Sequence, residues 1–98
     1  MIQAFIIHAA IEAMVLNTAQ TLNVLEYGMV LSISKQVSST AQMHFRVSMG
    51  IDSAITVEMV YTDRLIVRQE KVPYANLTEV VVVDFVMDCF DRAREFKS

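Results

Sequence analysis

The stretch AQMHFRVSM at residues 41–49 decides the fold, because its odd-numbered residues are apolar and its even-numbered residues are polar. Successive side chains of a strand point to opposite faces of a sheet, so this alternation predicts a half-buried strand. Its apolar side consists of Ala41, Met43, Phe45, Val47 and Met49. We expect the remaining apolar residues of the chain to cover this face.

The same alternation recurs on both sides of this strand. Residues 29–37 and 55–61 each place alternate apolar residues on one face, and a fourth strand begins at Leu65. Turn-forming clusters at residues 37–40, 50–53 and 62–64 separate these segments. The pattern predicts four antiparallel strands joined in sequence order.

A register follows from keeping the apolar residues on one side. Pairing Met49 with Ile55, and Tyr61 with Leu65, satisfies this condition along all the strands. The same register places Ile66, Arg68 and Glu70 on the polar side. His44, Arg46, Glu58 and Arg68 are then expected to form a polar outer face that could bind a ligand or a partner.

Helices are expected at both ends of the sheet. Residues 3–25 are rich in Ala, Leu, Met and Gln, contain no Pro or Gly, and stop before Gly28, which could cap a helix. A short strand is the alternative for the opening residues, several of which are bulky or β-branched. Asn76 and Glu79 have the spacing of a capping box and predict a second helix from Leu77 to about Phe96.

These elements predict one α+β domain over residues 1–98. We expect a two-layer sandwich of a four-stranded antiparallel meander and two helices, in the order α-β-β-β-β-α. Both helices should pack on the face that carries Met43, Phe45 and Val47. The resulting core has to hide a sequence that is 54% hydrophobic and only 19% charged.

That composition favours an oligomer. A chain of 98 residues hides only roughly two thirds of its surface on folding, so a monomer would leave apolar side chains in water. The second helix is apolar around most of its circumference, apart from a stripe of Asp84, Asp88, Asp91 and Glu95. We predict a contact between subunits at the surplus apolar flank, formed by Val83, Met87 and Phe90.

Charge and cysteine content limit the partners. A net charge of −3 and the lack of a basic run argue against nucleic acid. The apolar start lacks a basic flank and is interrupted by polar residues such as Gln3, His8 and Glu12, so we expect no signal peptide and no membrane partner. A lone Cys89 cannot form an intramolecular disulfide, which fits a cytoplasmic protein.

Residues with catalytic potential are scattered. His8 and Glu12 are four residues apart, as in an exposed helical ion pair, and no nucleophile motif accompanies them. The carboxylate stripe could hold a divalent cation, but solvated helix faces have the same pattern. Arg92 and Arg94 are expected to lie off this stripe and to leave its charge in place. We therefore predict no catalytic residue, no metal site and no cofactor.

The segment Val72-Pro73-Tyr74-Ala75, which follows the strands and precedes a helix, resembles the equivalent segment of SecB-type export chaperones. The resemblance covers about four residues, and the leading helix departs from that layout, so we identify no family. The sequence favours a non-enzymatic, homo-oligomeric interaction module of the adaptor, assembly-factor or inhibitor type, with another protein as a further partner. The alternatives are a small chaperone that shields apolar client segments, and a ligand-binding protein or enzyme that uses the outer face of the sheet.

Overall fold

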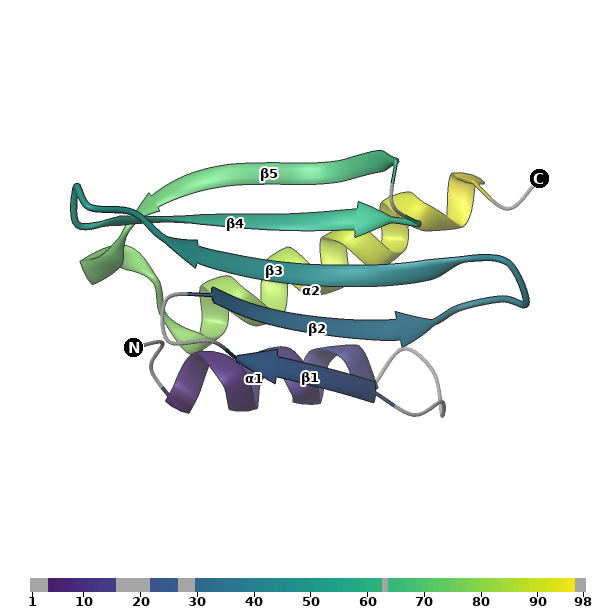
Figure 1. Ribbon diagram of the computed structural model, residues 1–98, viewed down its shortest axis with the longest axis horizontal. Coiled ribbons are helices and arrows are strands. Elements are labelled where there is room, and N and C mark those ends of the chain that lie inside the picture. Colours follow the sequence, from purple (N-terminus) through teal and green to yellow (C-terminus); the bar gives the residue numbers. More distant parts are fainter. Residues whose placement is uncertain (1–3, 16–21, 27–29, 63, 97–98) are drawn as a thin grey trace.

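The computed structural model describes residues 4–15, 22–26, 30–62 and 64–96, and Figure 1 shows a sheet with two helices behind it. The α+β class is confirmed, but the sheet formed by the described residues has five strands rather than four. In chain order the elements are α1 (Ala4–Val15), β1 (Leu22–Glu26), β2 (Val30–Gln36), β3 (Gln42–Met49), β4 (Ala54–Tyr61), β5 (Leu65–Pro73), a 3-10 turn (Tyr74–Asn76), α2 (Glu79–Ala93) and a second 3-10 turn (Arg94–Phe96).

The sheet is an antiparallel meander whose strand order in space, β1-β2-β3-β4-β5, equals the order in sequence. The two predicted pairs are confirmed, because Met49 lies opposite Ile55 and Tyr61 opposite Leu65. Along β2, β3 and β4 buried residues alternate with half-buried ones. Through the centre of the sheet the inner face is therefore mainly apolar, with Lys35 as an exception, and the outer face mainly polar, with Val60 as an exception.

β1 corrects the prediction that one helix extends to residue 25. α1 ends at Val15, and residues 22–26 pair with β2 so that Leu22 lies opposite Lys35 and Glu26 opposite Leu31. Helix propensity is a weak preference, and the ladder with β2 supplies partners for the backbone groups of this segment. Residues 16–21 and Gly28, which the prediction also used, lie outside the described residues.

A β-bulge in the last pair of strands reverses the predicted faces of β5. Val60 lies opposite Ile66, but the neighbouring Met59 lies opposite Arg68, so Val67 is an extra residue. The side chains of Arg68 and Glu70 therefore face the helices, and their prediction as outer-face residues is wrong. Gln69 takes the outer position instead and donates a hydrogen bond from Nε2 to Glu58 Oε2 at 2.9 Å.

The core lies between the inner face of the sheet and both helices. α1 and α2 pack against each other and against the face that carries Met43, Phe45 and Val47, as predicted. Phe45 of β3 meets Phe85 of α2 edge to face, with ring centroids 6.1 Å apart. Replacing a buried phenylalanine by alanine typically costs about 3–5 kcal/mol, so this contact is a main source of cohesion between the layers.

The start of α2 differs from the predicted capping box. Thr78 is the N-cap, and its Oγ1 accepts a hydrogen bond from the Val81 N–H at 3.3 Å. Asn76 belongs to the preceding 3-10 turn, and Leu77 between them is extended and buried. The burial of Leu77 in the core thus separates the turn from α2, and the helix begins two residues later than predicted.

Candidate functional site

Three of the four predicted outer-face residues share that face. His44 lies opposite Ser34 and Val60, while Arg46 lies opposite Glu58 in the β3–β4 ladder. Arg68 lies on the inner face because of the bulge described above. The predicted set of four therefore does not form one site, and only His44 of this set borders the outer-face pocket described next.

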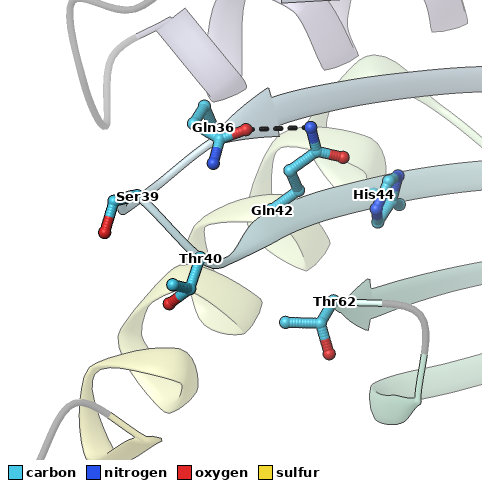
Figure 2. A pocket seen from close by; sticks show the side chains of 6 residues that line it. All are labelled: Gln36, Ser39, Thr40, Gln42, His44 and Thr62. Carbon is cyan, nitrogen blue, oxygen red and sulfur yellow. Dashed lines mark hydrogen bonds between the residues drawn. The ribbon is translucent and has the colours of Figure 1, made fainter.

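That pocket, of about 240 Å³, lies where β2 and β4 end and β3 begins (Figure 2). We call it the outer-face pocket, and its lining residues are Gln36, Ser39, Thr40, Gln42, His44 and Thr62. The Gln42 amide donates from Nε2 to Gln36 Oε1 at 2.8 Å, which joins the two strands across the pocket. The Gln36 amide in turn donates to the Ser38 carbonyl, so both glutamine side chains are held in place.

Thr62 closes the pocket with a strained backbone. Its φ is +55°, a left-handed value that is unusual for a β-branched residue. The Thr62 N–H donates to the Gln42 carbonyl at 2.7 Å, which fixes the turn against β3. Residues with strained backbones cluster at functional sites, so the positive φ of Thr62 supports the interpretation of this pocket as a binding site.

The described side chains that line the outer-face pocket can form hydrogen bonds, and none of them is a carboxylate, lysine or arginine. Among the described residues, which do not include Asp63, the lining contains two carboxamides, three hydroxyls and one imidazole. Such a lining suits a small neutral ligand rich in hydroxyl groups. Sequence reasoning singled out His44 but missed the other members, although polar residues flanking the turn at 37–40 were the available signal.

A charged cluster joins β5 to α2 on the inner side of the bulge. Arg68 donates from Nη1 to Asp88 Oδ2 at 2.8 Å and from Nε to Glu70 Oε1 at 2.9 Å, and its guanidinium lies 4.8 Å from the centre of the Phe85 ring. The hydrogen bond to Glu70, followed by the other contacts with Glu70 and Asp88, raises the pKa of Arg68 against the opposing effect of burial. This cluster clamps the edge of the sheet to the helix.

The carboxylate stripe on α2 is partly neutralised. Arg92 donates from Nε to Asp88 Oδ2 at 2.8 Å, and Arg94 lies 3.6 Å from Asp91. The prediction that these two arginines leave the charge of the stripe in place is therefore wrong, because side chains three or four residues apart on a helix are neighbours. No three His, Cys, Asp or Glu side chains of the described residues gather as metal ligands would.

The predicted contact residues on α2 have different environments. Phe90 is 8% exposed and packs in the core of its own chain, which leaves little of its ring for a second subunit. Met87 is exposed and Val83 is half-buried. Val83 lines a groove of about 370 Å³ between the helices, which we call the inter-helix groove; its other lining residues are Ala9, Glu12, Glu79, Val80 and Asp84.

Two reactive groups are buried inside the fold. Burial raises the pKa of the Cys89 thiol to about 12, so the thiolate needed for nucleophilic chemistry is absent at neutral pH. Lys35 is buried on the inner face of β2 and donates a hydrogen bond from Nζ to the Met14 carbonyl at the end of α1. Burial lowers the pKa of Lys35. Sequence reasoning missed this residue, although Lys35 continues the inward series of Leu31 and Ile33.

His8 and Glu12 are exposed on α1, with 3.8 Å between His8 Nδ1 and Glu12 Oε2, as in a surface ion pair.

Comparison with protein families, with curated proteins and with solved structures finds no match for this chain. Within the described residues, neither helix has the length and apolar character needed to cross a bilayer.

Proposed function

We propose that the protein is a non-enzymatic interaction module that self-associates through β1. The observation that carries this proposal is the exposed apolar surface at this end of the sheet. Val24 and Leu25 of β1 are 45% and 50% exposed, and Val30 at the start of β2 is 41% exposed. Leu25 and Val30 lie on the outer face, on either side of the connection between β1 and β2.

Within the described part of the chain β1 pairs only with β2, which makes it an edge strand. Edge strands present unpaired backbone groups that can bind another strand, and proteins normally protect them with charged side chains, proline or bulges. Leu22–Glu26 has a single charged residue, Glu26 at its end, and no lysine, arginine or proline, and its ladder with β2 runs without a bulge. An unprotected apolar edge is the kind of surface that a second copy can cover.

The corresponding assembly is a symmetric dimer in which the β1 strands of two copies pair antiparallel. A two-fold axis between the strands would place the same residues of both copies in contact and extend the sheet across the interface. The exposed side chains of Val24 and Leu25 would then pack against their counterparts. This arrangement leaves α2 and the outer-face pocket, which lie away from β1, accessible.

The test measures molar mass by light scattering after gel filtration. We expect a dimer for the wild type and a monomer for Leu25→Lys, because a charge near the two-fold axis would oppose its own copy. Ile66→Lys is the matched control, since Ile66 is an equally exposed apolar residue on β5, and it should leave the mass unchanged. Circular dichroism verifies that each variant stays folded.

The same measurement separates this contact from the one predicted on α2. If Met87→Asp lowers the mass and Leu25→Lys does not, the subunits meet through the helices and the β1 proposal is wrong. A monomeric wild type would reject self-association altogether. Suppression of aggregation of an unrelated unfolded protein by that monomer would favour the chaperone alternative.

The outer-face pocket supports a second candidate function, the binding of a small neutral ligand. Its neutral hydrogen-bonding groups and the strained turn at Thr62 are the observations that favour it. A ligand that binds the folded state raises its apparent stability. We expect a thermal-shift screen of neutral sugars and polyols to find compounds that stabilise the wild type but not Gln42→Ala, and a screen without such compounds would reject this candidate.

A further inference from the structure

The inter-helix groove has an apolar floor and an acidic rim. Ala9 is buried at its base, Val83 is half-buried, and Val80 is 68% exposed. The rim carries Glu12 from α1 and Glu79 and Asp84 from α2, and no basic side chain of the described residues lines the groove. Its volume of about 370 Å³ accommodates a few side chains, which is what a helix or short segment inserts into a groove.

The carboxylates of the rim differ from those elsewhere on α2. Asp88 accepts hydrogen bonds from Arg68 and Arg92, and Asp91 lies near Arg94. Among the described residues, by contrast, no arginine or lysine pairs with Glu79 or Asp84, and Glu12 has only His8 beside it. Three of the carboxylates that no described arginine or lysine neutralises on the helix layer therefore lie around the apolar floor.

A second copy of the chain is a poor occupant for this groove. A symmetric contact between two helix layers would bring the rim carboxylates of one copy toward those of the other, and like charges at an interface oppose association. Apolar side chains flanked by lysine or arginine would instead satisfy both the floor and the rim. Charge complementarity thus favours a basic partner of different sequence.

We propose that the inter-helix groove binds an amphipathic helical segment of another protein, whose apolar stripe is flanked by lysine or arginine. Apolar side chains three and four residues apart pack on Val80, Val83 and Ala9, and the flanking cations meet Glu12, Glu79 and Asp84. This proposal concerns a different surface from the β1 contact. A dimer formed through β1 would leave the groove open, so either proposal can fail without the other.

The probe is a short synthetic helical peptide with leucines at such spacings and lysines beside them, paired with a twin that carries glutamates in place of the lysines. Binding to the full chain is measured by fluorescence anisotropy at low and high salt. We expect the lysine peptide to bind at least roughly tenfold more tightly than the glutamate twin, and added salt to reduce this difference by screening. Amide shifts in NMR spectra should map the site to residues around Ala9, Val80 and Val83.

Variants of the chain identify the groove as the site. The double variant Glu12→Gln and Asp84→Asn should weaken the lysine peptide roughly tenfold, because both substitutions remove charge without changing shape. Asp91→Asn is the matched control, as it removes a carboxylate that already lies near Arg94 on the same helix. Val80→Ser, at an exposed position, should weaken both peptides by removing apolar contact.

Three outcomes would overturn the proposal. The first is failure of the lysine peptide to bind at millimolar concentration. The second is equal binding of the two peptides, which would remove the role of the rim. The third is that Asp91→Asn and the double variant weaken binding of the lysine peptide equally. This result would mean that the peptide responds to the net charge of the chain and not to the rim of the groove.

Discussion

β5 carries Arg68, Glu70, Lys71 and Pro73 together with a bulge, whereas β1 carries Glu26 as its one charged residue and pairs with β2 in regular register. Each of the features of β5 is a known means of preventing another strand from pairing with an edge. The bulge twists the strand, and Pro73 lacks a backbone donor. One edge of the sheet thus has several protective features, whereas the described residues of the other have few.

The two edges also differ in the partners of the basic side chain that lies near each of them, Arg68 at β5 and Lys35 near β1. Arg68 on β5 has Asp88, Glu70 and the Phe85 ring as partners, and the pKa of Arg68 is raised. Lys35, one strand in from the β1 edge, donates to the backbone carbonyl of Met14, and burial lowers the pKa of Lys35. Arg68 thus binds carboxylates at one edge, and Lys35 near the other edge binds a carbonyl at the negative end of the α1 dipole.

The largest effect is expected at the protected edge. Arg68→Ala removes the hydrogen bonds to Asp88 and Glu70 and uncovers Phe85. We expect the free energy of unfolding to fall by about 2 kcal/mol, after allowing for the partial exposure of the ion pairs. Urea denaturation measures this change.

Arg68→Met is the control for that prediction, since it keeps the packing of the long stem without the charge. The free energy of unfolding of Arg68→Met should fall by only about half as much as that of Arg68→Ala. If Arg68→Ala is as stable as the wild type, the cluster does not clamp β5 to α2, and the contrast between the edges loses its energetic basis.

A smaller effect concerns pH and Lys35. Because burial lowers the pKa of Lys35 below the ordinary value of 10.5, the folded chain loses this proton before the unfolded chain as pH rises. Stability should therefore increase as pH rises toward 10.5, and Lys35→Met should lack this increase. The measurement is urea denaturation across that pH window.

The difference between wild type and variant isolates Lys35, because other titrating groups, including Cys89, contribute equally to both curves. Lys71→Met, which removes an exposed lysine paired with Asp52, should keep the increase. If the free energy of unfolding changes with pH in the same way for the wild type and for Lys35→Met, burial does not lower the pKa of Lys35, and the predicted difference between Lys35 and Arg68 is wrong.

The smallest effect is expected in the turn that leads into β5. Thr62 has a φ of +55°, which β-branched residues adopt at a cost and which asparagine tolerates better. Thr62→Asn should raise the free energy of unfolding by about 0.5 kcal/mol. Thr62→Val, which keeps the branching but lacks the hydroxyl, should not stabilise. Thermal melts in which the Thr62→Val variant is more stable than the Thr62→Asn variant would show that backbone strain is not the controlling factor.

The sequence predicted the central strands and their register, because alternation along β3 and its neighbours leaves one arrangement that keeps the alternating apolar residues on the same face. It missed β1, since Leu22–Glu26 continues a segment rich in helix formers and has weak alternation. It also misplaced Arg68, because the bulge at Val67 contains no glycine that would have marked it. Both errors fall on the edges, where a strand has only one neighbour to fix its position.

The candidate sites were less predictable than the strands. His44 could be placed on the outer face from alternation alone, whereas the pocket beside it also needs Thr62, which a turn brings across from the end of β4. The inter-helix groove combines residues of α1 and α2 that are about 70 positions apart in the chain. Such contacts depend on how the helices pack, and periodicity within one helix does not encode that.

The strand order also bears on how the molecule acquires its shape. Each strand pairs with the next one along the chain, so hairpins can form in succession with little loss of loop entropy, which favours rapid assembly of the sheet. The helices α1 and α2 precede and follow that sheet in the chain, so the contact between them joins residues far apart in the sequence. During synthesis the apolar face therefore stays partly uncovered until α2 emerges, and the newborn chain is most prone to aggregate in that interval.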